Sequence, residues 1–558
     1  GPATRRAVWR SAAYARVRVG KRPGRCEDAH CMSDNGPRIR APQAAAAVAG
    51  GLERRERSIR SVAIVGGGTA GWLAASMLAR ALPGTGTVIS VIESPEIGIV
   101  GVGEATIPPI IDLLRFLGID ESDFIRHTNA TFKLGIKFID WRELGHSYWH
   151  PFGTFGAPVS RRPFHHCWHR ARAAGLPLRF NDFSVCAALG DVGKFRFPDR
   201  QPDAPGAGLR YALHFDATLV GKYLRAYAQR LGVVHLERTV AGATRRDDGA
   251  LEELRFSDGS SLQADLYIDC SGFRGALIEQ VLSTGYLDWT AMLPCDRAVA
   301  FPAASKLPRP PYTQALARSA GWQWRIPLQN RDGNGYVYSS AHLSEAQALA
   351  DLEGTVGSAP LAEPRRLRFV TGRRRLFWQR NCIALGLASG FLEPLESTSI
   401  HLVSSGLYHL LEHFPDRDFD QANIDAYNAR VIEEFEAIRD FIVLHYCLVQ
   451  RGDTEFWRYC RSMAIPDSLR ERIELYRGTG RIRIRSGELF TELSWFYILE
   501  GLGMRPASYD PLLDVVTTDS LREILASLAS STAAAVEPAL PHDSYFPAPA
   551  GRQPTARP

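Results

Sequence analysis

The chain lacks any stretch of about 18 consecutive uncharged apolar residues, which argues against a membrane-spanning helix. It also lacks C-x-x-C pairs, and its nine cysteines are an odd number scattered along 558 residues. That pattern is untypical of a disulfide framework or a cysteine-based zinc site. We therefore expect reduced thiols and a cytoplasmic protein.

Acidic residues are absent from residues 1–26, which hold eight Lys and Arg residues. The formal net charge of +6 comes from this segment, because the rest of the chain has a slight excess of acid. A near-neutral body gives little support to nucleic-acid binding. An Arg-rich, acid-poor opening can be a transit peptide. Since residues 1–57 also lack an apolar period, we favour a disordered extension, with Met32 as a candidate internal start.

The remaining composition, with 45% hydrophobic and 23% charged residues, is typical of a globular protein. The length exceeds what one core usually holds, so two or more lobes are expected. The Pro- and Ala-rich end of the chain is expected to be frayed. We predict an extension over residues 1–57, a nucleotide-binding core over 58–415, a helical lobe over 416–529 that completes the substrate site, and a disordered tail over 530–558.

A glycine pattern organises the predicted core. Residues 61–93 read SVAIVGGGTAGWLAASMLARALPGTGTVISVIE, in which two apolar runs flank a glycine turn and an amphipathic stretch. The order strand, G-x-G-x-x-G, helix lets a pyrophosphate sit on the helix N-terminus. Glu93 follows the strand predicted over residues 88–92, where a carboxylate meets an adenosine ribose. The predicted dinucleotide contacts are Gly66, Gly68, Thr69, Ala70, Gly71 and Glu93.

Later segments add candidate cofactor contacts. The segment GVGEATIPP, at residues 101–109, is too rich in glycine for the interior of a helix or strand and could lie against a flat ring. Short β-rich runs alternate with turns over residues 233–270, a predicted meander that ends in LYIDCSGFRG. Another short strand, at residues 382–385, leads into a glycine. The predicted contacts here are Gly103, Glu104, Ala105 and Gly386.

Two lysines, Lys133 and Lys137, lie in the apolar segment NATFKLGIKFIDW. Lysines four residues apart are usually solvated, so the period of this segment argues only weakly for a catalytic lysine. His165 and His169 lie one helical turn apart, but a zinc site needs further ligands at recognisable spacing and none stands out. We therefore expect no metal.

Two aromatic runs, GWQWRIP at residues 321–327 and NGYVYSS at residues 334–340, predict a strand pair. Its aromatic side chains fit core packing and ligand contact equally well. In FLEPLESTSIHL, at residues 391–402, Glu393 and Glu396 precede a Ser-Thr-Ser run that suits a helix cap. A helix start with free N–H groups attracts an anion.

These motifs, in this order over residues 60–515, resemble those of the flavin-dependent halogenases in the tryptophan halogenase family. The element W-x-W-x-I-P, which contains Trp322 and Trp324, is the hallmark of that family. The resemblance implies an α/β fold with an FAD-binding, flavin-monooxygenase-like (Rossmann-type) domain. A β-meander and sheet would belong to this domain, and a mainly helical C-terminal substrate lobe would follow it.

The resemblance also implies a mechanism. Reduced FAD, supplied by a separate flavin reductase, would react with oxygen and oxidise chloride or bromide to hypohalous acid. Lys133 would carry the halogen, as a haloamine or by a hydrogen bond, and Glu396 would assist its delivery or accept the ring proton. The implied halide contacts are Ser397, Thr398 and Ser399. The implied substrate contacts are His150, Phe152, Trp322, Trp324, Phe490 and Trp495.

Departures from the family pattern bear on the substrate. Many tryptophan-specific members have Gly where this chain has Ser399, and the segment GELFTELSWFYILEGLG has no Tyr-Tyr pair. We therefore expect an indole or another electron-rich aromatic substrate rather than free tryptophan. A flavin hydroxylase and an inactive flavoprotein scaffold are the alternatives. The first lacks its acidic turn near Gly386, and the presence of both Lys133 and Glu396 argues against the second. No membrane partner is expected, and a homodimer is left open.

Overall fold

The computed structural model describes residues 57–96 and 103–547. The expectations for residues 1–56, 101–102 and 548–558, among them the candidate start at Met32, lie outside these ranges. Every element named below belongs to the compact unit that begins at Arg57.

A six-stranded sheet forms the nucleotide-binding part of this unit. Its inner strands are apolar on both faces, as parallel strands covered by helices usually are; four of the five residues of β1 are buried. All neighbouring pairs are parallel except the edge pair β21–β22. The strands lie in the order β21 (Trp378–Gln379), β22 (Cys382–Ala384), β13 (Leu266–Asp269), β1 (Ser61–Val65), β2 (Val88–Glu93) and β9 (Val234–Glu237).

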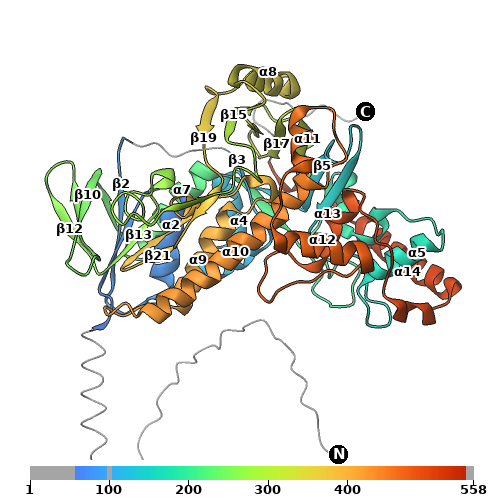
Figure 1. Ribbon diagram of the computed structural model, residues 1–558, viewed down its shortest axis with the longest axis horizontal. Helices are drawn as coiled ribbons and strands as arrows, with labels where there is room; N and C mark the ends of the chain where they lie inside the picture. The colour runs from blue at the N-terminus through green and yellow to red at the C-terminus, as the bar shows by residue number, and fades with distance from the viewer. Residues whose placement is uncertain (1–56, 97–102, 548–558) are drawn as a thin grey trace, which may run out of the picture. The chain divides into compact units, whose positions relative to one another are not determined.

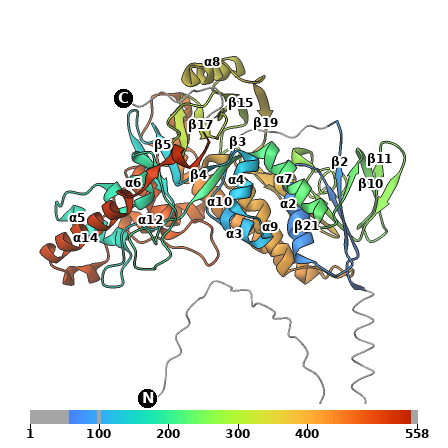
Figure 2. The same ribbon diagram turned by 180° about the vertical axis from the view of Figure 1, so that it is seen from behind.

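Helix α2 (Thr69–Ala81) follows β1 directly and packs on β1 and β2. Beside it lie α7 (Ala217–Arg230) and α9 (Ser399–Glu412), with α3 (Pro109–Leu117) and α4 (Glu121–Thr128) next to them (Figure 2). The strand–turn–helix–strand order predicted from the glycine pattern is confirmed, and β2 ends at Glu93.

The meander predicted over residues 233–270 forms only in its middle. Strands β10 (Val240–Arg245), β11 (Leu251–Phe256) and β12 (Ser261–Gln263) make an antiparallel sheet. The flanking strands β9 and β13 pair with the parallel sheet instead. All four residues of β13 are thereby buried beside β1, whereas β9 forms the edge of the sheet and stays partly exposed.

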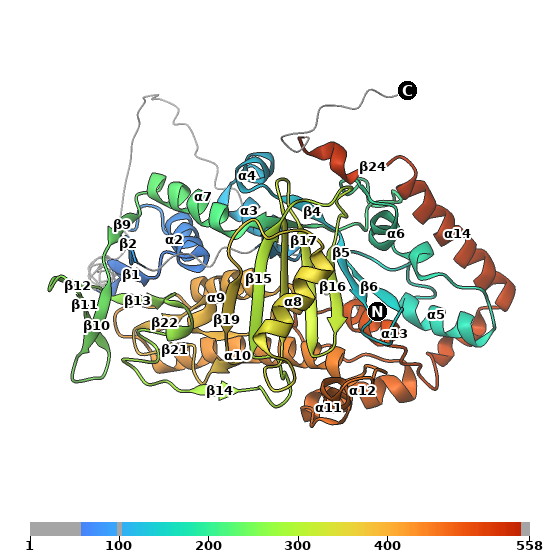
Figure 3. The same ribbon diagram turned by 90° about the horizontal axis from the view of Figure 1, so that it is seen from above.

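A seven-stranded sheet forms the second major layer (Figure 3). GWQWRIP is strand β17 and pairs in antiparallel fashion with β18, which confirms the predicted strand pair. The pair β16–β5 is parallel and brings the lysine segment into this sheet. The strands lie in the order β19 (Arg365–Arg368), β15 (Arg297–Ala303), β18 (Asp332–Tyr338), β17 (Gly321–Pro327), β16 (Thr313–Arg318), β5 (Gly135–Ile139) and β6 (Ser147–Pro151).

The remaining strands form three smaller sheets. In one of them β8 (Ala212–Asp216) pairs with both β3 (Gly103–Ala105) and β4 (Thr131–Lys133), so the two short strands lie on either side of it. The others join β14 (Tyr286–Asp288), β20 (Gly372–Arg374) and β23 (Gly390–Phe391), and β24 (Leu540–Pro541) with β7 (Lys194–Phe195).

Helices dominate the chain after residue 398, as predicted (Figure 1). The longest, α10 (Gln421–Cys447), is buried over nearly its whole last two turns. The other helices are α5 (Phe164–Ala173), α6 (Val185–Asp191), α8 (Glu345–Val356), α11 (Glu455–Ser462), α12 (Asp467–Thr479), α13 (Glu492–Gly501) and α14 (Thr518–Val536). Among the described residues, no helix is both long and apolar enough to cross a membrane.

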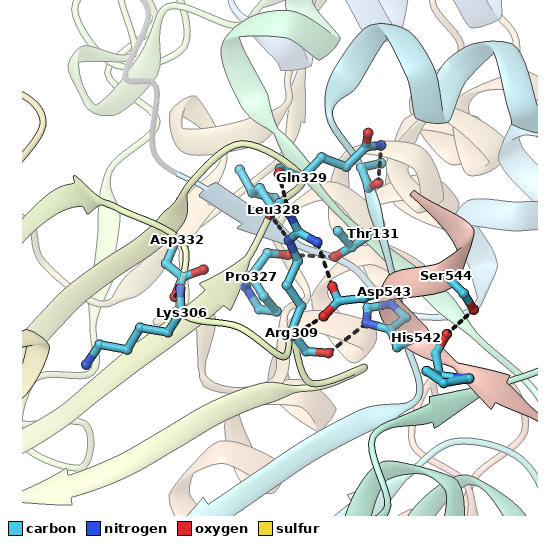
Figure 4. A network of polar contacts seen from close by, with 12 residues as sticks. Thr131, Lys306, Arg309, Pro327, Leu328, Gln329, Asp332, His542, Asp543 and Ser544 are labelled. Atoms are coloured by element: carbon cyan, nitrogen blue, oxygen red, sulfur yellow. Dashed lines mark hydrogen bonds and ion pairs between the residues drawn. The ribbon is translucent and has the colours of Figure 1, made fainter. Parts of the chain in front are cut away.

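The structure differs from the expected disordered tail over residues 530–547. Helix α14 continues to Val536, because Thr532 and Ala535 are buried on its inner face. Residues 540–545 then dock on the body, where the Asp543 carboxylate accepts from the buried Arg309 guanidinium at 2.5 Å (Figure 4). The composition of this segment, rich in Ala and Pro, concealed these few anchoring side chains.

Arg309 also stabilises the turn that follows β17. Its Nε donates to the Leu328 carbonyl at 3.0 Å and its Nη2 to the Gln329 carbonyl at 2.7 Å (Figure 4). The preceding carbonyl, that of Pro327, accepts from Thr131 Oγ1 at 2.6 Å. Thr131 lies on β4, two residues before the lysine at its end, so the docked C-terminal segment supports the strand that carries Lys133.

Candidate active site

The turn between β1 and α2 leaves no room for side chains on one side and is open on the other. A Cβ atom on Gly66 would lie 2.2 Å from the Cys270 carbonyl oxygen, and one on Gly71 would lie 1.8 Å from the Gly66 carbonyl oxygen. At Gly68, by contrast, a Cβ would meet nothing within 4 Å. Helix α2 starts there without a side-chain cap and without an acid in its first turn. The residues fit a bound pyrophosphate, which would take the place of the missing cap.

Glu93 lies beside this turn. A Cβ on Gly67 would be 2.2 Å from Glu93 Cδ, so only glycine allows this close approach. Glu93 Oε2 accepts from His235 Nε2 at 2.9 Å and lies 3.7 Å from the Arg225 guanidinium. These partners hold the carboxylate at the carboxyl end of β2, where a ribose hydroxyl can reach it.

The other predicted cofactor contacts separate into two groups. Gly386 has a φ of +63°, and a Cβ there would be 2.9 Å from that of Ala70, so the turn after β22 lies against the start of α2. Strand β3 lies elsewhere, against β8, β17 and β18. Glu104 on β3 is a neighbour of the lysine: burial raises the pKa of Glu104 to about 7, and the nearby charge of Lys133 opposes the rise.

Lys133 is fully buried at the end of β4. Its Nζ donates to the Thr106 carbonyl at 2.8 Å and to Ser397 Oγ at 2.8 Å, and it lies 5.3 Å from the centre of the Phe152 ring. Burial lowers the pKa of Lys133 to about 7, although the carboxylates of Glu396 and Glu104 raise it. Near neutral pH a substantial fraction of this amine is therefore uncharged and has a free lone pair.

Glu396, next to Ser397 in the chain, is 1% exposed. Its Oε2 accepts from His150 Nδ1 at 2.7 Å and its Oε1 from His445 Nε2 at 2.8 Å. Burial raises the pKa of Glu396, but His150 and His445 outweigh it by charge and hydrogen bonds and bring the value to about 2. The group is therefore a carboxylate at any pH at which the protein works.

The second ring nitrogen of His445 has a partner of its own. His445 Nδ1 lies 2.8 Å from the Phe441 carbonyl oxygen, which can only accept a hydrogen bond. His445 Nε2 faces the Glu396 carboxylate, which is also only an acceptor. The ring of His445 is thus held between the Phe441 carbonyl and the Glu396 carboxylate.

A second glutamate lies one turn earlier in the same loop. Glu393 Oε2 accepts from Trp322 Nε1 at 2.7 Å and from the Tyr446 hydroxyl at 2.7 Å. Its Oε1 is buried without a hydrogen-bond partner among the described residues. Burial raises the pKa of Glu393 to about 7, and the bonds from Trp322 and Tyr446 oppose the rise. Glu393 thus connects the hallmark tryptophan of β17 to helix α10.

The Ser-Thr-Ser run lies at the start of α9, as predicted. Ser397 adopts the left-handed conformation with a φ of +59°, which turns its hydroxyl towards Lys133. Thr398 is the N-cap of α9, but it makes no side-chain cap bond, and its buried hydroxyl has no hydrogen-bond partner in the described parts of the chain. Ser399 is the first residue of the helix, whose first turn holds no acid. Such a helix start favours a small anion.

Aromatic side chains form one side of the site. The His150 ring lies 5.6 Å from that of Phe441, 6.1 Å from Phe490 and 6.0 Å from Tyr497. Phe490 stacks on Phe441 at 3.8 Å. With Phe152 beside the amine and His150 bonded to the carboxylate, these rings give this side of the site an aromatic, largely buried surface.

The three tryptophans among the predicted substrate contacts, Trp495, Trp322 and Trp324, pack against other side chains or backbone. Trp495 packs edge-on against Phe441 at 5.0 Å, and the Arg472 guanidinium covers its ring at 4.0 Å, so Phe441 lies between Trp495 and His150. Trp322 donates to Glu393, and Trp324 lies over Gly335 of the neighbouring strand, where any Cβ would overlap the indole. All three are packed side chains in this structure.

The histidine pair on α5 has other partners. His165 Nε2 lies 3.2 Å from the Gly480 carbonyl and His169 Nε2 lies 3.1 Å from the Tyr476 hydroxyl. Over residues 57–96 and 103–547 no group of three or more His, Cys, Asp or Glu side chains is arranged to hold a metal. Lys137 is half-buried and pairs with Asp191 at 2.7 Å.

Sequence reasoning missed several members of the site. His445 and Tyr446 were hidden in the apolar stretch FIVLHYC, and Phe441 and Tyr497 looked like core residues of helices. Two polar residues in a continuous apolar stretch were the available signal, because buried polar groups are normally paired.

A nucleotide turn on one sheet, together with a buried amine near a buried carboxylate, fits an FAD-binding enzyme with an enclosed reaction site. Comparison with known proteins identifies it further. The tryptophan halogenase family matches residues 61–518. The chain therefore belongs to the tryptophan halogenase family, and it is an FAD-dependent halogenating oxidoreductase.

Individual relatives agree with this assignment. BrvH, a flavin-dependent halogenase from Brevundimonas sp. BAL3, is 43% identical with a TM-score of 0.85, over 88% of this chain and 99% of its own. The tryptophan 6-halogenase SttH from Streptomyces toxytricini is 32% identical with a TM-score of 0.81, over 88% of this chain and 99% of its own. The tryptophan 7-halogenase RebH from Lentzea aerocolonigenes is 34% identical over 510 residues, which are 84% of this chain and 95% of RebH.

Proposed function

We propose that this enzyme halogenates an indole or another electron-rich aromatic compound with the halogen relayed through Lys133. The observation that supports this most directly is the buried contact of the Lys133 amine with Ser397 Oγ, next to the buried Glu396, whose charge raises the pKa of Lys133. Bound reduced FAD supplies the oxygen chemistry that oxidises chloride or bromide to an electrophilic halogen. A separate flavin reductase would supply the reduced FAD.

The uncharged amine of Lys133 has the lone pair needed to bind an electrophilic halogen. Its two acceptors, the Thr106 carbonyl and Ser397 Oγ, fix the direction of its N–H bonds and therefore that of the lone pair. Burial keeps water away from a bound halogen, which water would otherwise remove. We assign halide contact to the start of α9, at Ser397, Thr398 and Ser399, because no acid lies in its first turn.

Glu396 is suited to accept the proton that the ring carbon loses when the carbon–halogen bond forms. It is ionised, and it is one residue from the serine that contacts the lysine. His150 and His445 hold both of its oxygens, so its position is fixed before the substrate arrives. His150, Phe152 and Phe490 would hold the aromatic ring.

A reconstituted assay tests the proposal. The protein is supplied with a flavin reductase, FAD, oxygen, bromide or chloride and indole, and the products are identified by mass spectrometry. Halogenated product supports the proposal, hydroxylated product indicates a hydroxylase, and absence of both indicates an inactive scaffold. Lys133→Ala is expected to abolish halogenation while flavin oxidation continues. Persistent halogenated product in that variant would remove Lys133 from the relay.

A cytoplasmic location is part of the proposal. It rests on the cysteines: those among residues 57–96 and 103–547 are all free, and most of them are buried.

A further inference from the structure

A cavity of about 530 Å³ lies beside the edge strand β6 and helix α13, and of the aromatic residues around His150 and Lys133 it shares only Tyr497. Tyr148 and Trp149 of β6 line one side, Trp168 and Arg172 of α5 another, and Tyr497 of α13 a third. The packing between the two elements is tight, since a Cβ on Gly501 would be 2.2 Å from the Tyr148 ring. Such a cavity can hold a small organic molecule.

The lining of this cavity carries an excess of positive charge. Glu500 accepts from two arginines, from Arg172 Nη1 at 3.1 Å and from Arg505 Nη1 at 2.9 Å, so one carboxylate faces two guanidinium groups. Arg142 brings a third guanidinium; its Nη2 lies 3.3 Å from the Glu143 carboxylate, and its Nε is buried without a hydrogen-bond partner in the described residues. The charged lining residues are Lys137, Arg142, Arg172, Arg179 and Arg505 against Asp182, Asp191 and Glu500.

The three arginines around Glu500 repel one another. Burial lowers the pKa of Arg505, and the charges of Arg172 and Arg142 add to that effect while Glu500 opposes it. His146, also in the lining, has its pKa lowered by burial and by Arg142, so it adds no positive charge at neutral pH. Like charges held together in a partly buried place are unfavourable unless an anion joins them.

Three aromatic residues of the lining also bear unused donors. Tyr148, Trp168 and Tyr497 are 7%, 3% and 2% exposed. Their hydroxyl and indole N–H groups have no hydrogen-bond partner among residues 57–96 and 103–547. Buried polar groups are nearly always paired in native proteins. A wall that combines unpaired donors with surplus guanidinium groups matches a ligand that is rich in acceptors.

We propose that this cavity binds the carboxylate or phosphate group of a small ligand, with Arg172 and Arg505 as its principal contacts. The flat surfaces of Trp149 and Trp168 suit a ligand in which that group is attached to an aromatic ring. The same charge repels an ammonium group, so a free amino acid is disfavoured. Tyr497 links the cavity to the active site, because its ring is 6.0 Å from that of His150, the donor to Glu396.

The anionic group belongs either to a separate small anion or to an aromatic ligand, and one experiment distinguishes the two. Isothermal titration calorimetry is performed on the full chain, without flavin or halide, with inorganic phosphate, with indole-3-propionate and with uncharged indole. Because the readout is binding, its outcome is independent of whether the protein halogenates anything. Arg505→Gln and Arg172→Gln are expected to weaken the anionic ligands about 10-fold or more, which is the effect of one lost charged hydrogen bond. Indole should bind equally in all variants.

Controls keep the result interpretable. Arg505→Lys retains the charge and should recover much of the affinity, and Arg115→Gln removes an exposed arginine of α3 that pairs with Asp112 and should change nothing. Thermal melting establishes that each variant is folded. If phosphate binds and depends on Arg505, the site takes a separate anion; if only indole-3-propionate does, the group belongs to an aromatic ligand. Absence of binding, or binding that neither Arg505→Gln nor Arg172→Gln weakens, would overturn the proposal.

Discussion

His445 Nε2 lies 2.8 Å from Glu396 Oε1, while the next residue of α10, Tyr446, donates to Glu393 at 2.7 Å. Two consecutive side chains of one helix thus hold the two glutamates of one loop. Because one carboxyl has its pKa lowered to about 2 and the other has its pKa raised to about 7, neighbouring residues create two different acids. The difference follows from the partners: two imidazole rings bond the carboxylate of Glu396, whereas an indole and a phenol bond that of Glu393.

His445→Phe is predicted to lower the halogenation rate about 10- to 100-fold, as expected from one lost charged hydrogen bond. The substitution keeps a ring in the buried position but removes the donor, so the pKa of Glu396 rises and its carboxylate becomes mobile. Product per flavin oxidised is the measurement. Tyr446→Phe is the matched control, since it alters Glu393 and leaves both partners of Glu396 in place. Equal rates in wild type and His445→Phe would contradict the role of His445 in positioning Glu396.

Glu396→Gln is predicted to slow halogenation about 100-fold or more, because general-base catalysis typically contributes that much. The amide can still accept from His150 but cannot take a proton from the ring carbon. Flavin oxidation should continue at its normal rate. Single-turnover product formation followed by mass spectrometry separates the two steps, and a normal rate in this variant would exclude Glu396 as the base.

The rate of halogenation is predicted to rise with pH through about 7. Burial places the pKa of Lys133 at about 7, so the amine is an ammonium below that pH and neutral above it. Only the neutral form has the lone pair that the proposed relay needs. The measurement is product per flavin oxidised between pH 5.5 and 9, chosen as about 1.5 to 2 units on either side of that pKa.

The carboxyl group of Glu104, whose pKa is raised to about 7, is the competing source of such an inflection. Glu104→Gln removes a negative charge that raises the pKa of Lys133, so the inflection should move to lower pH and persist. A profile that falls above pH 7 would mean that the ammonium form holds the halogen by a hydrogen bond. Loss of the inflection in Glu104→Gln would assign it to Glu104.

Asp543→Ala is predicted to reduce the free energy of unfolding by about 2 kcal/mol, less than for a fully enclosed pair because Asp543 is partly exposed. Arg309 is 1% exposed and would be left with a buried charge and only carbonyl partners. Ser544→Ala, at the next position, is the control. Chemical denaturation of both variants measures the difference, and similar stabilities would contradict the anchoring role of Asp543.

The nucleotide-binding half could be predicted because its signals are local. Glycines at fixed spacing, an apolar strand and an acid at the end of the next strand all lie within residues 61–93. The seven-stranded sheet was visible only in part, since the parallel pair β16–β5 joins segments about 180 residues apart in the chain. The hydrophobic period within one segment carries no information about which distant segment it pairs with.

The site was predictable mainly through resemblance. The contact between Lys133 and Ser397 spans 264 residues, and neither residue is unusual in its own segment. His445 was missed because it lies in the last two turns of α10, which are buried on nearly all sides and show no amphipathic period. The tail after residue 530 was misjudged because Ala and Pro dominate its composition, while Thr532, Ala535 and Asp543 do the packing.

The docking of residues 540–545 bears on how the enzyme can be engineered. Arg309 joins Asp543 to the turn after β17, and Thr131 joins that turn to the strand of Lys133. Trimming the chain after α14 for a fusion protein or for surface display would therefore loosen the lysine from a distance, without altering any group that reacts. A shortened version should keep every residue through Tyr545, and a library aimed at catalysis has reason to include this far end of the chain.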